Sequence, residues 1–250
     1  MKVTQGARSG AGRYGNDGLR TYLDVLSDLF YPRRCAGCES RASDVLCRAC
    51  CEALPLIEDE RCGRCGLPTA FDTPVCEWCK TRDYAFDTAV APVRYEGPGR
   101  GLVRALKYDG DFAAASRVMA PLMVEALGER SCDVVVPVPM HPARRRKRGF
   151  NQAVVIAGEV AGRIGRPLVD RLRTVRRVRD QVELNASERR ENVRGAFRFE
   201  DGAGGRKKVG GAVLLVDDVF TTGATLSECA RALVGAGARE VHAVSFCRTC

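Results

Sequence analysis

The 250-residue sequence contains no apolar run close to the roughly 20 residues that a membrane-spanning helix requires. Residues 1–18 read MKVTQGARSGAGRYGNDG, a polar, glycine-rich stretch without the apolar core of a secretion signal. A G-x-x-x-x-G-K-[ST] phosphate-binding loop is also missing, which argues against a P-loop nucleotide hydrolase. We therefore expect a cytoplasmic protein without membrane insertion, in which residues 1–18 form a disordered tail.

Aromatic side chains are scarce where positive charge is concentrated. The net charge is +9, and residues 141–198 hold 16 Lys and Arg against 6 Asp and Glu. Such a stretch is typical of proteins that bind phosphate, either in a small ligand or in a nucleic acid. The aromatic residues in and beside it are Phe150, Phe197 and Phe199, which supply little surface for stacking the bases of a single strand.

Cysteine, in contrast, is abundant, and nine of the 13 cysteines fall between residues 35 and 79. Two C-x-x-C pairs complete a tetrahedral shell for Zn²⁺, so we expect two structural zinc sites in a double zinc ribbon at residues 33–85. Sequential and cross-braced pairings both satisfy the spacing, and Cys51 competes with Cys50 as a ligand. The four pairs are Cys35/Cys38, Cys47/Cys50, Cys62/Cys65 and Cys76/Cys79.

A disulfide scaffold is the alternative for these cysteines, but the cytosol keeps thiols reduced. Four protein ligands leave no open position at a zinc ion, which indicates structural rather than catalytic sites. A fifth C-x-x-C, Cys247/Cys250, has no second pair beside it, and we interpret it as incidental.

Hydrophobic periodicity predicts an amphipathic helix at residues 19–32, ended by Pro32, and an α/β domain at residues 86–250. In that domain strand and helix alternate, which predicts a parallel sheet with helices on both faces. Pro92 favours an edge position for the first strand. Strands are expected at 86–95, 133–137, 212–216 and 241–246, helices at 100–127 (broken near 109–110), 153–164 and 225–234, and a long loop or hairpin at 171–200.

Ligands in such folds bind beyond the carboxyl ends of the strands, where the polar loops 138–152 and 217–225 are expected to lie. Two adjacent acids, Asp217 and Asp218, open the second loop within VLLVDDVFTTGAT. Backbone N–H groups of the TTGAT segment would converge at the start of the next helix and form an anion site. Acids repel phosphate, so this pair suits the vicinal hydroxyls of a ribose, or a Mg²⁺ ion carried with the substrate. A helix cap beside an incidental acid pair is the alternative.

VLLVDDVFTTGAT resembles the phosphoribosyl-pyrophosphate (PRPP) motif of type I phosphoribosyltransferases. The resemblance implies the fold of that family, an α/β domain with a central parallel sheet flanked by helices. It also implies that Asp217 and Asp218 hold the ribose hydroxyls of PRPP, which binds with Mg²⁺. The loop residues that would cradle the 5′-phosphate are Thr221, Thr222, Gly223, Ala224 and Thr225.

The loop HPARRRKRGFNQ at 141–152 is similar to the pyrophosphate-loop region of the same superfamily. Its five consecutive basic residues could neutralise a diphosphate, and we select Arg144 and Arg148 as candidate ligands because arginine matches phosphate oxygens in pairs. A solvated basic turn is the alternative for any one of these side chains. His141 is a candidate general base or a structural imidazole.

A third segment, QVELNASERRENVRGAF at 181–197, matches a Q-x-x-L-x-x-x-x-R-x-x-N pattern. It resembles the mobile catalytic loop of glutamine-PRPP amidotransferases and, more closely, the ComF family of competence-associated proteins. This resemblance makes Gln181, Arg189 and Asn192 catalytic candidates. It extends from about residue 19 to the end of the chain and includes the cysteine pairs, LKYDGD at 106–111 and the HP-x-R-x₃-RGFNQ loop. A glutamine amidotransferase half would need a cysteine at position 1 or 2, and none stands there.

The resemblance leaves two functions open. In the first, the chain is a PRPP-binding protein of the ComF type, linked to natural competence, that handles incoming single-stranded DNA in the cytoplasm with the DNA-uptake machinery. In the second, it is an active phosphoribosyltransferase, a pentosyltransferase of nucleotide metabolism or salvage that is unrelated to DNA uptake. The sequence identifies neither the acceptor nor the oligomeric state.

Overall fold

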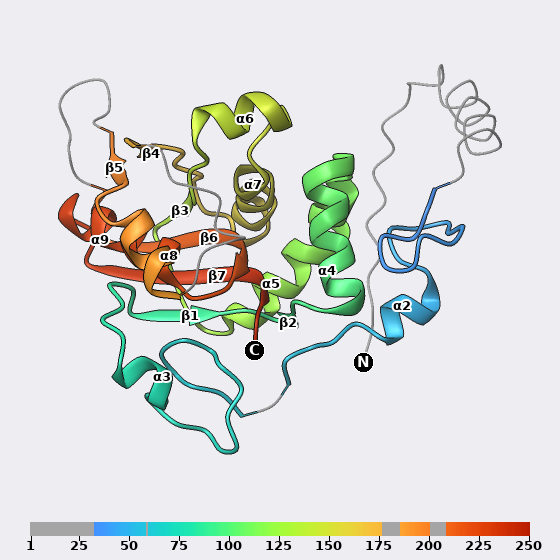
Figure 1. Cartoon of the computed structure of the whole chain (residues 1–250), viewed down its shortest axis with the longest axis horizontal. Coiled ribbons are helices and arrows are strands. Elements are labelled where there is room, and N and C mark those ends of the chain that lie inside the picture. Colours follow the sequence, from blue (N-terminus) through green and yellow to red (C-terminus); the bar gives the residue numbers. More distant parts are fainter. Residues whose placement is uncertain (1–32, 59, 177–185, 201–208) are drawn as a thin grey trace, which may run out of the picture.

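Apolar runs from distant parts of the chain pair side by side as one parallel sheet (Figure 1). The strand order is β1-β7-β6-β3, and β2 also pairs with β7. Because both faces of this sheet are covered, its central strands are almost continuously apolar rather than alternating. The strands are β1 (Thr88–Val90), β2 (Val93–Arg94), β3 (Val134–Pro137), β6 (Ala212–Phe220) and β7 (Glu240–Arg248).

This computed structural model describes residues 33–58, 60–176, 186–200 and 209–250, without the side chains of residues 186, 187, 189 and 190. The predicted tail at 1–18 and the predicted helix at 19–32 lie outside the described residues. Within the described part of the chain, no helix is both long and apolar enough to cross a membrane. The division of the chain at residue 86 stays a prediction.

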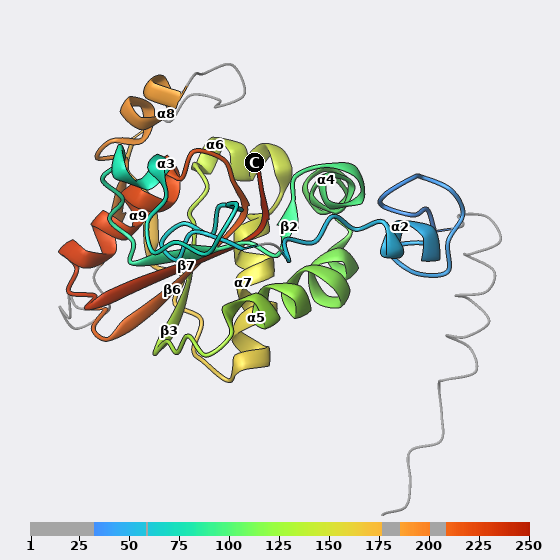
Figure 2. The same cartoon turned by 90° about the horizontal axis from the view of Figure 1, so that it is seen from below.

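Helices cover both faces of the sheet (Figure 2). Apolar side chains of α4, α5 and α7 pack on one face, and those of α9 pack on the other. A small antiparallel pair, β4 with β5, lies outside the main sheet. The remaining elements are α2 (Arg48–Glu52), α3 (Glu77–Lys80), α4 (Gly97–Arg104), η1 (Ala105–Asp109), η2 (Ala114–Met119), α5 (Ala120–Leu127), α6 (Pro142–Arg148), α7 (Gln152–Ile164), β4 (Leu172–Thr174), α8 (Ala186–Val193), β5 (Phe197–Phe199) and α9 (Ala224–Gly235).

Strand β6 sends alternate side chains to the two faces of the sheet. Leu214 and Val216 belong to the core under α7, whereas Val213 and Leu215 belong to the core under α9. The alternation breaks beyond Val216, since Val219 packs with the core under α7 and Phe220 with the core under α9. The two neighbouring acids of the DD motif lie at this break, and both line the same cavity.

The structure confirms the parallel sheet, the edge position of the first strand and the break near residue 110, where Gly110 has φ +67°. Three expectations were wrong in detail. The expected strand at 86–95 is two short strands that both pair with β7. The expected strand at 212–216 extends to Phe220, because β7 continues to pair with it. The expected polar loop at 138–152 contains the helix α6.

Candidate functional site

A cavity of about 580 Å³ opens beyond the carboxyl ends of β3 and β6, where the sequence predicts a ligand site. We call it the strand-end cavity. Both segments predicted to meet there contribute to its walls, the end of β6 with the following loop, and α6. The predicted site residues that line it are Asp217, Asp218, Thr221, Gly223, Ala224, Thr225, Arg144 and Arg148.

The two acids at the end of β6 interact with each other and share one lysine. Asp218 is 5% exposed and forms an ion pair with Lys107 of η1, whose side chain is 20% exposed. Asp217 lines the same cavity, and its Oδ1 accepts a hydrogen bond of 2.8 Å from the Asp218 backbone N–H. Lys107 is thus in direct contact with Asp218 and acts on Asp217 only through its electrostatic field.

This arrangement moves the two carboxyl pKa values apart. Burial and the Asp218 charge raise the pKa of Asp217 well above its ordinary value. Burial also acts to raise the pKa of Asp218, but the Lys107 ammonium outweighs it and lowers the pKa. Burial acts to lower the pKa of Lys107, and the Asp218 carboxylate outweighs this effect and raises it. The ion pair is thus charged at neutral pH, and Asp217 is the member of the acid pair whose ionisation is disfavoured.

The loop between β6 and α9 turns at Gly223, which has φ +75°. A Cβ atom at this position would lie 2.7 Å from Phe220 and 2.8 Å from Tyr84, so both the backbone conformation and the space require glycine. Ala224 begins the helix, and its N–H contacts Thr222 Oγ1 at 3.4 Å. Thr222 is the predicted loop residue that is not among the lining residues of the cavity.

A buried tyrosine that follows the last C-x-x-C pair, Cys76/Cys79, holds this loop in place. Tyr84 is 5% exposed, and its hydroxyl donates a hydrogen bond of 2.7 Å to the carbonyl oxygen of Thr222. Trp78 Nε1–H in turn donates to the Tyr84 hydroxyl at 2.8 Å. Burial raises the pKa of Tyr84 to about 12, so the hydroxyl stays protonated and can donate. We call Trp78 and Tyr84 the loop brace.

Helix α6 begins at His141, whose Nδ1 accepts a hydrogen bond of 3.2 Å from the Ala143 N–H. A proline at its first position and Gly149 in the left-handed conformation after its last residue are standard helix boundaries. The His141 ring thus has the structural role, that of a helix cap. Arg148 donates a hydrogen bond of 2.6 Å to Gln152 Oε1 and lies 5.6 Å from the Tyr108 ring centroid.

The predicted catalytic loop borders the same cavity. Val193 at the end of α8 and Phe197 of β5 line it, and the Gly195 N–H donates to Glu228 of α9 at 2.7 Å. Asn192 lies in α8, as does the backbone of Arg189, whose side chain is outside the description. Gln181 falls outside the described residues.

The eight predicted zinc ligands form two separate tetrads, each with its sulfur atoms within 4.8 Å of one another. The pairing is sequential, and Cys50 rather than the exposed Cys51 completes the first tetrad. The Sγ–Sγ distances are 3.7 Å for Cys38–Cys47 and 3.8 Å for Cys65–Cys76. A tetrahedron with Zn–S bonds of about 2.3 Å has edges of about 3.8 Å, so both tetrads fit Zn²⁺. The first tetrad is Cys35, Cys38, Cys47 and Cys50, and the second is Cys62, Cys65, Cys76 and Cys79.

The two tetrads contact different parts of the α/β core, and their modules lie apart in both Figure 1 and Figure 2. The first approaches α4 so closely that a Cβ on Gly101 would lie 2.1 Å from the Ala36 carbonyl oxygen. The second shares a hydrophobic core with the sheet and α9. Buried Arg248 at the end of β7 donates to the carbonyl oxygen of Cys65, and its guanidinium lies 4.4 Å from the Phe220 ring centroid. Cys247 is buried and Cys250 is exposed.

Sequence reasoning missed Lys107 and the loop brace. Lys107 stands in the quoted LKYDGD segment, and a buried acid pair requires a cation, so a search for that cation could have found it. The contact of Tyr84 with Thr222 joins positions 138 residues apart, and no local pattern predicts it.

Comparison with known proteins agrees with both halves of this description. Residues 26–80 match the double zinc ribbon domain, and residues 151–249 match the phosphoribosyl transferase domain. The fold and the tetrads thus define an α/β protein of the phosphoribosyltransferase type that carries a double zinc ribbon.

Relatives narrow this class. The DNA utilization protein YhgH of Salmonella typhimurium strain LT2 is 32% identical over 195 residues, which cover 75% of this chain and 84% of that protein. Competence protein ComFC of Streptococcus pneumoniae is 31% identical over a region that covers 81% of this chain and 87% of that protein. Competence protein F of Haemophilus influenzae is 26% identical over a region that covers 88% of this chain and 98% of that protein. The chain belongs to the ComF family.

Proposed function

We propose that this protein binds PRPP with Mg²⁺ in the strand-end cavity and, in that role, takes part in the cytoplasmic handling of single-stranded DNA. The observation that carries the first half is the division of charge in the cavity. Acids line the end of β6, arginines line α6, and the loop before α9 lies beside them. PRPP presents the same three groups, a ribose with two hydroxyls, a diphosphate and a 5′-phosphate.

Each part of the ligand has a matching set of residues. Asp217 and Asp218 would accept hydrogen bonds from the ribose hydroxyls, while Arg144 and Arg148 would bind the diphosphate. Backbone N–H groups at the start of α9, a helix of 12 residues, would bind the 5′-phosphate with the side chains of the loop. Lys107 would hold Asp218 in position and keep it ionised.

Mg²⁺ fits this donor set because it prefers hard carboxylate oxygens together with phosphate oxygens. Asp217 supplies a carboxylate at the cavity wall that has no direct ion pair with Lys107, which contacts Asp218 instead. Mg²⁺ would neutralise part of the diphosphate charge when it is bound. A nearby cation would also favour ionisation of Asp217, so binding of PRPP with Mg²⁺ would relieve the unfavourable charge at this position.

The DNA half of the proposal is supported by the printed names of the relatives and by charge. Those names refer to DNA utilization and to competence. Residues 141–198 hold more positive charge than the strand-end cavity uses, since Arg144 and Arg148 are its lining residues from α6. Such an excess attracts a polyanion.

Transfer of ribose phosphate to an acceptor is a second candidate function, favoured by the position of α8 and β5 at the cavity mouth. In that reaction the bond from C1 of the ribose to the diphosphate breaks, pyrophosphate leaves and a nucleophile bonds to C1. Gln181, Arg189 and Asn192 belong to the segment that would close over the leaving group. Incubation with PRPP and Mg²⁺, with pyrophosphate release measured over time, tests this candidate.

Calorimetric titration of PRPP with Mg²⁺ tests the binding proposal. Asp217→Asn and Asp218→Asn should each weaken binding by at least tenfold, because each removes an acceptor of the ribose hydroxyls and one negative charge from the metal site. Asp44→Asn is the matched control, since Asp44 is an exposed acid of the first ribbon that pairs with Arg117. Wild-type protein that binds no PRPP, or acid variants that bind as wild type does, would contradict the proposal.

A further inference from the structure

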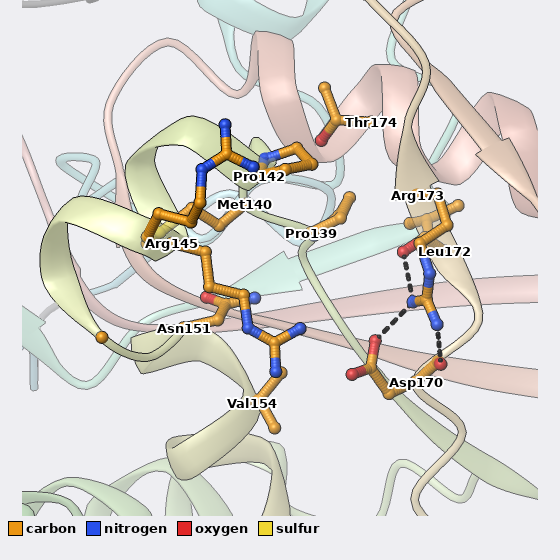
Figure 3. Close-up of a pocket in the computed structure, with 12 residues that line it drawn as sticks. Pro139, Met140, Pro142, Arg145, Asn151, Val154, Asp170, Leu172, Arg173 and Thr174 are labelled. Atoms are coloured by element: carbon orange, nitrogen blue, oxygen red, sulfur yellow. Dashed lines mark hydrogen bonds and ion pairs between the residues drawn. The ribbon is translucent and has the colours of Figure 1, made fainter.

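Helix α6 separates two cavities. Besides the strand-end cavity on one side, a second cavity of about 500 Å³ lies between α6 and β4 (Figure 3). We call it the α6–β4 cavity. Its walls include Arg145 and Arg146 of α6 and Leu172 and Arg173 of β4, with Val154 of α7 at its base.

The basic run of α6 divides between these cavities by helical geometry. Successive residues of an α-helix are about 100° apart, so Arg144 and Arg148, four positions apart, share one face. Arg145 and Arg146 therefore point elsewhere and line the α6–β4 cavity, while Lys147 lines neither cavity. Arg144 and Arg148, the two residues selected from this run as candidate diphosphate ligands, are those that line the strand-end cavity.

The charge in the α6–β4 cavity favours an anion. Asp170 lines it and is bound by Arg173, with 2.9 Å between Nη1 and Oδ1 (Figure 3). Arg145, Arg146 and Arg173 thus give the cavity wall three guanidinium groups against one carboxylate. Among the described residues, no carboxylate forms an ion pair with Arg145 or Arg146. Two guanidinium groups thus face a cavity in which they lack acidic partners.

The cavity also adjoins the proposed PRPP site. Pro139, Met140, Asn151 and Thr174 line both cavities and form the wall between them. Leu172, Pro142 and Val154 add apolar surface beside the arginines. The α6–β4 cavity is therefore large enough for a nucleotide, with cations on one side and apolar side chains on the other.

We infer that the α6–β4 cavity binds the phosphodiester backbone of a single-stranded nucleic acid, with Arg145 and Arg146 as its phosphate ligands. The inference rests on the DNA half of the proposed function and gives it a location separate from PRPP. The strand occupies one side of α6 and PRPP occupies the other. Both ligands can then be bound at once, across a wall that they share.

Binding of a fluorescein-labelled oligothymidylate, followed by fluorescence anisotropy at several salt concentrations, tests this site. Arg145→Ala and Arg146→Ala should each weaken binding by about tenfold, since a hydrogen bond to a charged group contributes at least about 1.5 kcal/mol. The double variant should lower the slope of log affinity against log salt by about 1.4, or about 0.7 for each lost phosphate contact. PRPP affinity, measured by calorimetry, should stay within twofold of wild type.

Lys147→Ala is the matched control, because it removes the same charge from the same helix at a position that faces neither cavity. It should weaken strand binding by less than threefold. Circular dichroism melting of each variant shows whether the fold is retained. Loss of strand binding in Arg146→Ala with retained binding in Lys147→Ala supports the site even when PRPP does not bind, so failure of the PRPP proposal is recognised separately.

Three results would overturn the inference. The first is that the wild-type protein binds no oligothymidylate. The second is that Lys147→Ala weakens binding as much as Arg146→Ala, which would indicate nonspecific attraction. The third is displacement of the strand by PRPP or by inorganic phosphate at constant ionic strength. Competition of that kind would show that the strand uses the PRPP site or that the cavity takes a lone phosphate.

Discussion

Tyr84→Phe, which removes one hydroxyl, should weaken PRPP binding although Tyr84 does not line the strand-end cavity. The substitution keeps the aromatic packing, in which the Tyr84 ring stacks on Phe86 at 4.6 Å between centroids and meets Phe220 edge-on at 6.4 Å. It deletes the hydrogen bond to the Thr222 carbonyl and the acceptor for Trp78. The change therefore isolates the loop brace from the hydrophobic core.

The magnitude follows from those two bonds. Polar groups left without partners on burial cost about 1–3 kcal/mol, so the free energy of unfolding should fall by about that amount. The bond to Thr222 contributes about 1 kcal/mol, and it holds the loop in the conformation that binds phosphate. If that contribution is lost from the bound conformation, the Kd for PRPP rises about fivefold. Thermal melting and calorimetric titration measure the two effects.

Thr88→Val is the matched control for Tyr84→Phe. It removes a side-chain hydrogen bond of 2.9 Å, from Thr88 to His242, at the amino end of the sheet, away from the strand-end cavity. It should lower stability by a similar amount and leave PRPP affinity unchanged. A Tyr84→Phe protein that is destabilised like the control, but binds PRPP within twofold of wild type, would refute the positioning role of the loop brace.

Three further predictions concern charge and metal. Asp217→Asn should raise the melting temperature at pH 7, because the raised pKa of Asp217 makes its ionisation costly above about pH 4; the gain should vanish as the pH falls to about 4 in a series of melts. Lys107→Met should lower stability by about 3–5 kcal/mol at neutral pH, since it leaves a buried carboxylate without its cation. The stability difference between Lys107→Met and the wild type should shrink below about pH 4. There Asp218 is protonated in the variant, and the wild type loses the stabilisation that ionised Asp218 provides. A stability difference that is independent of pH would contradict the ion pair. Mass spectrometry should find two zinc ions per chain, and Cys38→Ser and Cys65→Ser should each lose one of them. Cys65→Ser should also weaken PRPP binding, because its tetrad adjoins the loop brace. Equal PRPP affinity in the two variants would show that the loop brace does not depend on the metal.

Spacing and periodicity predicted the parts of this fold that depend on neighbouring residues. The four C-x-x-C pairs identified both tetrads, and the apolar runs located the central strands within a few residues. The choice of Cys50 over Cys51 needed the structure, because both lie next to each other in sequence and only their burial and direction differ.

Sequence reasoning missed one feature because of distant partners and another because local signals conflicted. Strand β6 continues through two acids, which disfavour a strand locally, because β7 pairs with it as far as Phe220 with Arg248. Helix α6 has a capping residue, a proline and a glycine at the expected positions, but its run of like charges favoured a loop. In α6 the boundary residues favour a helix and the repulsion between like charges disfavours one, and the segment is helical.

The position of β7 between β1 and β6 determines the order in which the molecule can assemble. Thr88 and His242 are neighbours in the sheet but lie 154 residues apart in the chain. At a translation rate of about 5–20 residues per second, β1 waits about 8–30 s for its partner. Cysteines of the second tetrad, such as Cys62 and Cys79, lie 17 residues apart and can meet almost at once. On the ribosome the metal ribbons should therefore mature early, while the unpaired edge of β1 stays open to chaperones or to misplaced strands until β7 emerges.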